Sequence, residues 1–317
     1  MGDVPVVSVI INCFNSAAYL REAIDSVYRQ TFSDWEIVFF DNNSTDSSAS
    51  IALSYDDRVQ YFKNDKTVLL GEARNLAIEK ARGEFIAFLD CDDVWLPEKL
   101  SLQLKQFRKP STRPVGFCYT DAMRVDSQGN HLLSYSHEKD LFGGNIYREL
   151  IYSSFIACSA CIIRKDVFDK VGLFNPELHY VEEWDLWLRI AKYYDLAFVD
   201  SKLTEIRVHD SNVSRDIEGQ YSEKVKLAEM IIDRDPAMKS ECQRSMNMSA
   251  VQYQLTKLLL ARNSELFSQL LVMIGTVLAK PAATIAIARK MINPKIYKAF
   301  RKKYLSSESS VVHGNKV

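Results

Sequence analysis

Apolar runs and amphipathic stretches alternate over residues 6–107, and this alternation restricts the fold more than any other feature of the sequence. The apolar runs are rich in β-branched and aromatic residues, which is typical of strands buried on both faces of a sheet. The predicted strands are 6–13, 36–40, 58–62 and 84–89, and the predicted helices are 17–30, 44–54, 71–81 and 97–107. Strands and helices that alternate at this spacing predict an α/β fold with a Rossmann-like, doubly wound and mostly parallel sheet.

The pattern changes after a proline-containing joint at 109–114. Gly129 lies at a turn that predicts a hairpin after the next strand. Asn15 and Ser16 are expected to cap the first helix, because such side chains accept hydrogen bonds from the first helical amides. From about residue 216 the sequence pattern predicts helices almost to its end. Beyond the joint, the predicted strands are 115–125, 156–163, 196–199 and 203–208, and the predicted helix is 181–194.

Charge and cysteine content exclude several classes of protein. The 317 residues include 40 Lys+Arg and 41 Asp+Glu, and this net charge of −1 argues against a surface that coats nucleic acid. Six cysteines are too few for a disulfide scaffold. Cys158 and Cys161 are expected to be buried strand thiols, with a zinc or redox site as the alternative. No basic segment precedes the first apolar run, so no signal peptide is expected, and the cytoplasm is the default location.

Two of the predicted strands end in acidic residues. Ligands of doubly wound sheets bind beyond the carboxyl ends of the strands, so these residues are candidates for a site. Asp41 follows the second strand, where its carboxylate can accept hydrogen bonds from a nucleotide base or ribose. The alternative is a turn that leads to a helix cap at Ser44 or Thr45, and this turn is favoured when Asp41 is considered alone.

The fourth strand ends in the sequence Asp90-Cys91-Asp92-Asp93. Three carboxylates within four residues repel one another, and a divalent cation is the simplest compensation. Hard oxygen ligands suit Mg²⁺ or Mn²⁺. A solvated turn is the alternative, but acids directly after a buried strand favour the metal.

Together these elements resemble the family 2 glycosyltransferases of the GT-A fold. The resemblance spans about residues 6–215 and rests on many motifs that occur in order rather than on a lone Asp-x-Asp pair. It implies a GT-A domain with a C-terminal helical extension, and transfer of a sugar from a nucleotide-sugar with inversion. The motifs that resemble those of the family are 7–15, 19–20, 23–27, 30–31, 41–46, 71–75, 83–93, 95–100, 172–174, 182–189 and 207–209.

The resemblance implies a donor site at the ends of the first, second and fourth strands, and a Mn²⁺ or Mg²⁺ ion held by Asp92 and His209. Many relatives have a second Asp where Asn42 stands, so the nucleotide stays open and UDP is the default expectation. Residues 12–15 would line the base and ribose pocket, and Asp41 would contact the nucleobase. The implied donor-binding residues are Asn12, Cys13, Phe14, Asn15, Asp41, Asn42, Arg74, Asp90 and Cys91.

Glu182 and Glu183 open the helix predicted at 181–194. Acids in a first helical turn interact favourably with the helix dipole, which is a sufficient structural explanation for most of the acids here. The resemblance implies that the second acid of this pair is the general base that removes a proton from the acceptor hydroxyl. Glu183 is therefore the expected base, and Glu182 is the fallback.

The C-terminal segment combines an apolar stretch with uncompensated positive charge. Residues 266–306 contain no acid and eight Lys or Arg residues. Pro281 within the apolar part argues against a membrane-spanning helix. Attachment to an anionic membrane surface is expected, with an apolar helix docked on the catalytic domain as the alternative. The expected domains are 1–215, 216–265 and 266–317.

The sequence therefore predicts a metal-dependent inverting glycosyltransferase of surface polysaccharide assembly that acts on a glycan or lipid-linked acceptor. Its expected location is cytoplasmic, including the cytoplasmic face of the membrane. A nucleotidyltransferase is the enzymatic alternative, although the segment 12–16 lacks the Gly and basic residues of its phosphate loop. An inactive nucleotide-sugar-binding module is the non-enzymatic alternative.

Overall fold

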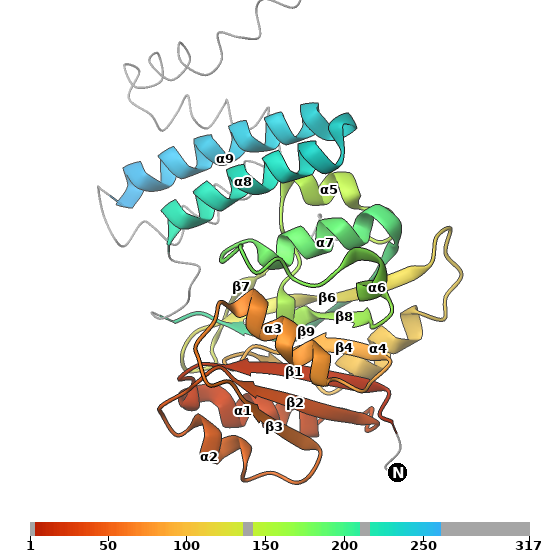
Figure 1. Cartoon of the computed structure of the whole chain (residues 1–317), viewed down its shortest axis with the longest axis vertical. Coiled ribbons are helices and arrows are strands. Elements are labelled where there is room, and N and C mark those ends of the chain that lie inside the picture. The colour runs from red at the N-terminus through yellow and green to blue at the C-terminus, as the bar shows by residue number, and fades with distance from the viewer. Residues whose placement is uncertain (1–3, 136–141, 210–215, 261–317) are drawn as a thin grey trace, which may run out of the picture. The chain divides into compact units, whose positions relative to one another are not determined.

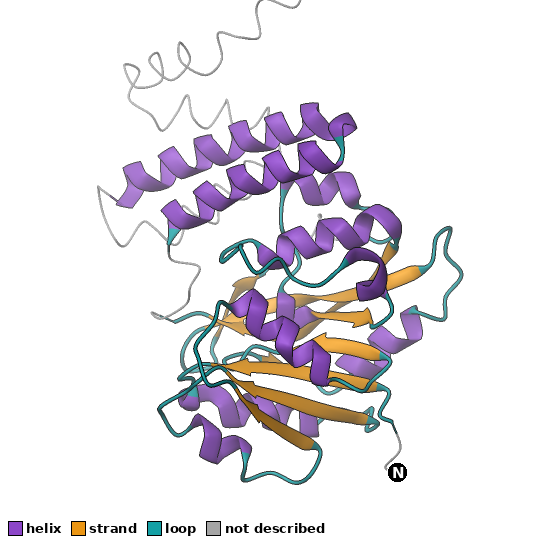
Figure 2. Ribbon diagram, viewed as in Figure 1, coloured by secondary structure: helices purple, strands orange, loops and turns teal. Residues whose placement is uncertain are grey.

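The computed structural model describes residues 4–135, 142–209 and 216–260. A single sheet organises the first of two compact units, Met1–Asn247, and the second unit is Met248–Val317. The strand order is β3-β2-β1-β4-β8-β6-β9-β5, and β7 pairs with β6 (Figures 1 and 2). The strands are β1 Val7–Cys13, β2 Trp35–Asp41, β3 Val59–Lys63, β4 Phe85–Phe88, β5 Val94–Trp95, β6 Val115–Val125, β7 His131–Ser134, β8 Cys161–Arg164 and β9 Asp195–Arg207.

Helices cover both faces of the sheet (Figure 2). The α/β class and the mostly parallel first half of the sheet are confirmed, because β1 pairs in parallel with both β2 and β4, and β2 pairs in parallel with β3. The helices are α1 Ala17–Tyr28, α2 Ser48–Ala52, α3 Leu70–Lys80, α4 Lys99–Gln106, α5 Tyr147–Tyr152, α6 Val167–Val171, α7 Glu182–Tyr193, α8 Ile217–Arg234 and α9 Lys239–Leu260, with 3₁₀ turns η1 Cys158–Ala160 and η3 Pro236–Met238.

Strand β1 shows why the apolar runs become central strands. Val9 and Ile11 belong to one core with Ile24 of α1, whereas Ile10 belongs to the other with Ala77 of α3. Successive side chains of a strand point to opposite faces, so a strand between two helical layers needs apolar residues at nearly every position.

The capping prediction for the first helix is wrong. The Ser16 side chain makes no capping bond and its hydroxyl donates to the Phe14 carbonyl. Asn15 has a positive φ of 50°, and its side-chain oxygen accepts hydrogen bonds from Thr45. The first amide of α1, on Ala17, instead donates to Asp46, 29 residues away. The hydrogen bond at the start of α1 is therefore accepted by the distant Asp46 rather than by the neighbouring Asn15 or Ser16.

Two strand predictions are also wrong in part. The segment 156–163 is not a continuous strand, because Cys158 lies in the 3₁₀ turn η1 and the strand β8 begins at Cys161. Both thiols are buried and unbridged, as expected for thiols of the core. The two predicted strands 196–199 and 203–208 form one strand, β9, which stays paired with β6 through register shifts. The predicted helix 44–54 is reduced to α2, because 44–47 form a turn instead.

The helical prediction beyond 216 is confirmed as far as α8 and α9 reach. No helix within 4–135, 142–209 and 216–260 is both long and apolar enough to cross a bilayer. The predicted membrane-binding segment 266–306 lies outside the described residues.

Candidate functional site

The carboxyl ends of β1, β2 and β4 lie at one edge of the sheet, because these strands run in parallel. The end of β9 and the first turn of α7 reach the same region, since His209 contacts Asp92 and Glu182 contacts Arg74. The structure thus brings together the acidic turn 90–93, the pair Glu182–Glu183 and His209, as the sequence predicted. These three parts of the site are far apart from one another in the sequence.

The turn 90–93 is tied to its surroundings by several bonds. The Asp90 carboxylate accepts a hydrogen bond from Arg74 Nη2 at 3.1 Å. Asp92 Oδ2 lies 2.8 Å from His209 Nε2. Asp93 Oδ1 accepts a bond from the Arg207 amide at 3.0 Å, and Asp93 Oδ2 accepts one from the Ser159 hydroxyl at 2.6 Å. Asp93 therefore supports the turn from inside the protein, whereas Asp90 and Asp92 face the site.

The carboxylates of the turn 90–93 carry more negative charge than the neighbouring cationic side chains compensate. Burial raises the pKa of Asp92, and the negative charge of Asp90 raises it further. Burial likewise raises the pKa of Asp93, with contributions from Asp92 and Asp90. Shifts of this direction mean that the ionised carboxylates repel one another and lack water. A cation beside Asp92 would compensate both effects.

The pair Asp92 and His209 fits a divalent cation. Adjacent ligands of an octahedral Mg²⁺ site lie about 3 Å apart, close to the 2.8 Å between these two atoms. His209 is held in place by a stacked ring contact with Tyr19, at 5.5 Å between ring centroids. Among the described residues, no three His, Cys, Asp or Glu side chains surround one point as metal ligands. Water and substrate oxygens would complete the coordination, as is usual for Mg²⁺.

The predicted donor pocket contains one polar atom that lacks a partner. Asn12 Nδ2 is buried at the end of β1 and makes no hydrogen bond within the described part of the chain. Phe14 beside it is 51% exposed despite its apolar ring. The Cys91 thiol donates to the Asn12 carbonyl at 3.1 Å, and a hydrogen bond with the Cys91 thiol lowers the pKa of Cys13 to about 7. A nucleotide oxygen at this position would give the buried N–H group the acceptor that it lacks.

Considered alone, Asp41 was expected to form a turn that leads to a helix cap at Ser44 or Thr45. The structure shows the turn, but helix α2 begins at Ser48 and neither Ser44 nor Thr45 caps it. Asp41 is fully buried, its Oδ1 accepts a bond from the Ser44 amide at 2.7 Å and its Oδ2 accepts one from the Tyr61 hydroxyl at 2.7 Å. Asn42 is bonded through its side chain to both backbone groups of Val68. The side chains of Asp41 and Asn42 are thus both bonded to the protein itself.

The two glutamates at the start of α7 differ in their surroundings. Glu182 is 3% exposed, and its Oε1 lies 3.0 Å from Nη1 of the buried Arg74. Arg74 thereby joins Glu182 to Asp90. Glu183 is partly exposed, and an interaction with the Cys158 thiol lowers its pKa slightly against the larger effects that raise it. Burial, opposed by the Arg74 charge and assisted by Glu182 and Asp90, raises the pKa of Glu183 to about 8. Glu183 is therefore the acid that can exchange a proton near neutral pH.

Two residues of the site, Ser159 and Arg207, were given no role in the sequence analysis, although Arg207 belongs to the motif 207–209. Ser159 accepts a hydrogen bond from the Asp90 amide and donates one to Asp93, so it fixes both ends of the acidic turn. It lies between the two cysteines of the 158–161 motif, and no local signal distinguishes it from a core serine. Arg207 donates to the Asp92 carbonyl and pairs with Glu22. Its guanidinium lies over the Tyr19 ring, which stacks on His209.

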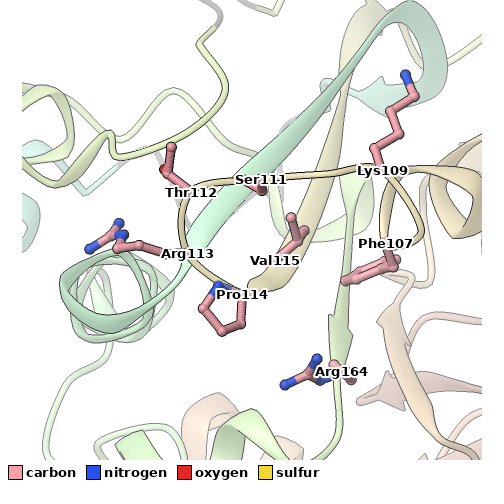
Figure 3. Close-up of a pocket in the computed structure, with 8 residues that line it drawn as sticks. All are labelled: Phe107, Lys109, Ser111, Thr112, Arg113, Pro114, Val115 and Arg164. Atoms are coloured by element: carbon pink, nitrogen blue, oxygen red, sulfur yellow. The ribbon is translucent and has the colours of Figure 1, made fainter.

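A separate depression of about 400 Å³ lies at the opposite edge of the sheet, where β6 begins and β8 ends (Figure 3). Its lining includes Lys109, Arg113 and Arg164, of which Arg113 is paired with Asp195 and Arg164 with Asp166. None of the predicted site residues lines it. The candidate site is therefore the edge formed by the carboxyl ends of β1, β2 and β4.

Comparisons with known proteins identify the family and the fold. The family described as glycosyl transferase family 2 matches residues 8–172. An uncharacterized glycosyltransferase of Rickettsia typhi is 32% identical over 228 residues, which are 69% of this chain and 69% of that protein. WfgD of Escherichia coli, a UDP-Glc:α-D-GlcNAc-diphosphoundecaprenol β-1,3-glucosyltransferase, is 26% identical over 66% of this chain and 79% of its own length.

Among solved structures, the mannosyltransferase PcManGT of Pyrobaculum calidifontis, in complex with GDP-Man and Mn²⁺, has a TM-score of 0.59 to this chain. The match covers 91% of this chain and 87% of PcManGT at 18% sequence identity. At this identity the match establishes the fold.

Proposed function

The chain belongs to glycosyltransferase family 2 and is a glycosyltransferase with the GT-A fold, and from this premise we propose its donor, metal and mechanism. The proposed reaction is inverting transfer of a sugar from a UDP-sugar to a hydroxyl of a glycan or lipid-linked acceptor, dependent on Mn²⁺ or Mg²⁺. It serves surface polysaccharide assembly. WfgD supports both the nucleotide and the class of acceptor, since its name specifies UDP-Glc and a diphosphoundecaprenol acceptor.

The observation that most supports this mechanism is the position of Glu183, because Arg74 pairs with both Asp90 of the turn 90–93 and Glu182, the neighbour of Glu183. The pKa of Glu183 is raised to about 8, so its ionised form is a stronger base than an ordinary carboxylate, and this form accepts the proton of the acceptor hydroxyl. The hydroxyl oxygen forms a bond to the anomeric carbon while the bond from that carbon to the diphosphate breaks, and the hydroxyl proton goes to Glu183. Attack opposite the leaving diphosphate inverts the configuration.

Asp92 and His209 would hold the divalent cation, which when bound neutralises charge on the diphosphate. Asn12 would place its unpaired amide N–H against the nucleotide, beside the exposed Phe14 ring. Glu182 serves the site through Arg74, because their ion pair fixes the first turn of α7 relative to Asp90. Asp41 is proposed to shape the nucleobase pocket through the turn 41–44, in which both of its oxygens accept hydrogen bonds.

A screen of nucleotide-sugars tests the proposal. UDP-glucose, UDP-GlcNAc and GDP-mannose are compared by thermal shift with and without Mn²⁺, because a ligand that binds the native state raises the melting temperature. A UDP-sugar is expected to give the largest Mn²⁺-dependent shift. A shift with GDP-mannose alone would overturn the proposed nucleotide, and no shift with any donor would contradict the donor site.

Two matched variants test the base. Glu183→Gln should lower the turnover by roughly 10²–10⁴-fold with donor affinity nearly unchanged. Glu182→Gln should mainly lower the melting temperature, since it removes the charge that faces the buried Arg74. The reverse order of the two effects on turnover would assign the base to Glu182.

We also propose that residues 266–306 attach the protein to an anionic membrane surface. Each of the eight cationic side chains near such a surface contributes about 1 kcal/mol, which salt screens. The full chain should pellet with anionic vesicles more than with neutral ones, and a chain that ends near residue 265 should not. Equal pelleting with both kinds of vesicle would contradict the electrostatic contribution.

A further inference from the structure

Helix α8 follows the predicted catalytic domain, yet it holds the segment that leads into α7. The Glu223 carboxylate of α8 accepts hydrogen bonds from three consecutive backbone amides, those of His179, Tyr180 and Val181. The N···O distances are 2.9 Å from His179, 2.6 Å from Tyr180 and 3.3 Å from Val181. Val181 directly precedes the first residue of α7, so Glu183 lies two residues beyond the last of these amides.

Other contacts join the same two segments. The Tyr180 hydroxyl donates to Asp216 Oδ2 at 2.5 Å, while Asp216 Oδ1 caps α8 by accepting bonds from Glu218 and Gly219. A Cβ at Gly219 would lie 2.7 Å from Asp216 Oδ2, so this corner is closely packed. At the other end of α8, Arg234 Nη1 lies 2.6 Å from Oδ1 of the fully buried Asp185 of α7. Contacts at both ends of α8 thus hold α7 and the loop before it.

Burial supports the same attachment. Leu227, Ala228 and Ile231 of α8 belong to the core that contains Trp184 and Trp187 of α7. An ionised carboxylate that accepts several N–H bonds is held more strongly than a neutral acceptor. Without Glu223, the amides of 179–181 would lose their acceptor, and the loop would be free to move. A displacement of about 1 Å at a reacting group can reduce a rate by about 10²-fold.

We propose that Glu223 is a positioning residue: its carboxylate fixes the backbone of 179–181 and thereby orients Glu183 toward the acceptor hydroxyl. This inference rests on the proposed role of Glu183 as the base. It makes α8 part of the catalytic apparatus rather than an appendage to it. The residue works through the backbone and touches neither donor nor acceptor.

The test compares Glu223→Ala and Glu223→Gln with Glu229→Gln in the full-length chain. Glu229 is a matched control, because it is an exposed glutamate of the same helix with no hydrogen bond or ion pair in the described part of the chain. With UDP-glucose, Mn²⁺ and octyl N-acetylglucosaminide as probes, Glu223→Ala should lower kcat by about 10- to 100-fold with donor KM nearly unchanged. Glu223→Gln, which keeps one acceptor oxygen, should lose less, and Glu229→Gln should match the wild type.

Chemical rescue separates positioning from general loss of structure. Formate can occupy the space of the missing carboxylate and accept the same amide bonds, so it should restore part of the kcat of Glu223→Ala. Sodium chloride at equal ionic strength should not. A folded Glu223→Ala variant with wild-type kcat, or with a loss of kcat that formate does not reduce, would overturn the inference. If Glu223→Ala does not fold, wild-type kcat in Glu223→Gln would overturn it.

Hydrogen exchange gives a readout that needs no turnover. Amides of 179–183 should exchange faster in Glu223→Ala than in Glu229→Gln, while β1 and β4 remain protected in both. Unchanged exchange at 179–183 would overturn the inference even in an enzyme that accepts other substrates. A wild-type protein that is inactive on every nucleotide-sugar but shows this exchange difference would contradict the proposed function and leave the attachment of the loop intact.

Discussion

Two acidic turns occupy equivalent places in the sheet and are stabilised in different ways. The turn 41–46 follows β2, and the turn 90–93 follows β4. In the first turn, Asp41 accepts bonds from Ser44 and Tyr61, and Asp46 accepts bonds from the amides of Ala17 and Ser48. In the second turn, burial and mutual repulsion raise the pKa values of Asp92 and Asp93.

The difference shows that the place of a turn in the sheet and the groups that balance the charge of its carboxylates are independent of each other. Both turns lie where parallel strands present ligand sites, so position alone does not identify a metal site. The turn 41–46 satisfies its carboxylates with N–H and O–H donors of the protein and needs no ion. The turn 90–93 leaves Asp92 facing the site with His209 as its neighbour, and its charge deficit favours a cation.

The largest expected effect is that of Asp92→Asn. A neutral amide is a poor ligand for Mn²⁺ or Mg²⁺, and the loss of metal stabilisation of the leaving diphosphate is worth several kcal/mol. Transfer at saturating UDP-sugar should therefore fall by about 10²–10⁴-fold, measured as initial rates over a Mn²⁺ titration. The melting temperature without Mn²⁺ should not fall, because the substitution removes a repulsive charge.

Asp46→Asn is the matched control for this prediction, since it makes the same chemical change in the other turn. It should leave the Mn²⁺ dependence of the rate unchanged. Wild-type activity and an unchanged Mn²⁺ titration in Asp92→Asn would show that the metal is held elsewhere.

A smaller effect on stability is expected from Ser159→Ala. The Ser159 hydroxyl is bonded to both the Asp90 amide and Asp93 Oδ2, and Ser159 is 1% exposed. Its loss leaves buried polar groups unpaired, which should lower the free energy of unfolding by about 2–3 kcal/mol. Chemical denaturation gives this value, and Mn²⁺ binding should weaken in parallel. Unaltered stability would mean that the turn 90–93 does not depend on η1.

Much of the first half of the fold can be predicted from local sequence, whereas in the second half the strand at 115–125 and the helix at 181–194 are predicted but the segments 156–163 and 195–207 are not predicted correctly. The apolar run at Val7–Cys13 fixes a central strand, because alternate residues must fill two cores at once. The continuity of β9 depends instead on its pairing with β6, and the polar residues 200–201 within it suggest a break. Local propensity does not include the pairing energy of a distant strand.

The residues of the candidate site also fall into those that local sequence can identify and those that it cannot. The acids at 90–93 and 182–183 can be found because carboxylates directly after a strand or at the start of a helix are visible in sequence. Ser159 and Glu223 cannot be found, since each gains its role from partners 42 or more residues away along the chain. The predicted cap of α1 is wrong for the same reason, because the distant Asp46 accepts the hydrogen bond from the Ala17 amide and the local Ser16 makes no capping bond.

Tyr61→Phe tests how far the turn 41–46 depends on protein donors. The Tyr61 hydroxyl donates to the fully buried Asp41, and burial together with this bond raises the pKa of Tyr61 to about 12. A bond to a charged acceptor is worth about 1.5 kcal/mol or somewhat more, so the free energy of unfolding should fall by about that amount. The Mn²⁺ dependence of transfer should stay as in the wild type. A changed metal titration would show that the two turns are coupled.

The smallest effect is expected from Asp46→Ala, and its size depends on pH. Asp46 is exposed, and its carboxylate accepts bonds from the Ala17 and Ser48 amides, so its loss should cost about 1 kcal/mol, as for a helix cap. Loss of hydration alone would raise the pKa of Asp46, but the bonds from Ser48 and Ala17 lower it overall. A carboxyl with a lowered folded-state pKa stabilises the protein above its unfolded value of about 3.9, and this contribution is lost as the pH falls through the folded value. The difference in melting temperature between wild type and Asp46→Ala should thus be constant from about pH 5 to 7 and shrink below about pH 4.

The pKa of Asp92 is raised, so its ionised form lowers the free energy of unfolding, and the same linkage predicts that this destabilisation shrinks on acidification. Melting curves of Asp46→Ala and Asp92→Asn across this range should therefore diverge from the wild type in opposite directions, and a parallel response would remove the distinction between the two turns.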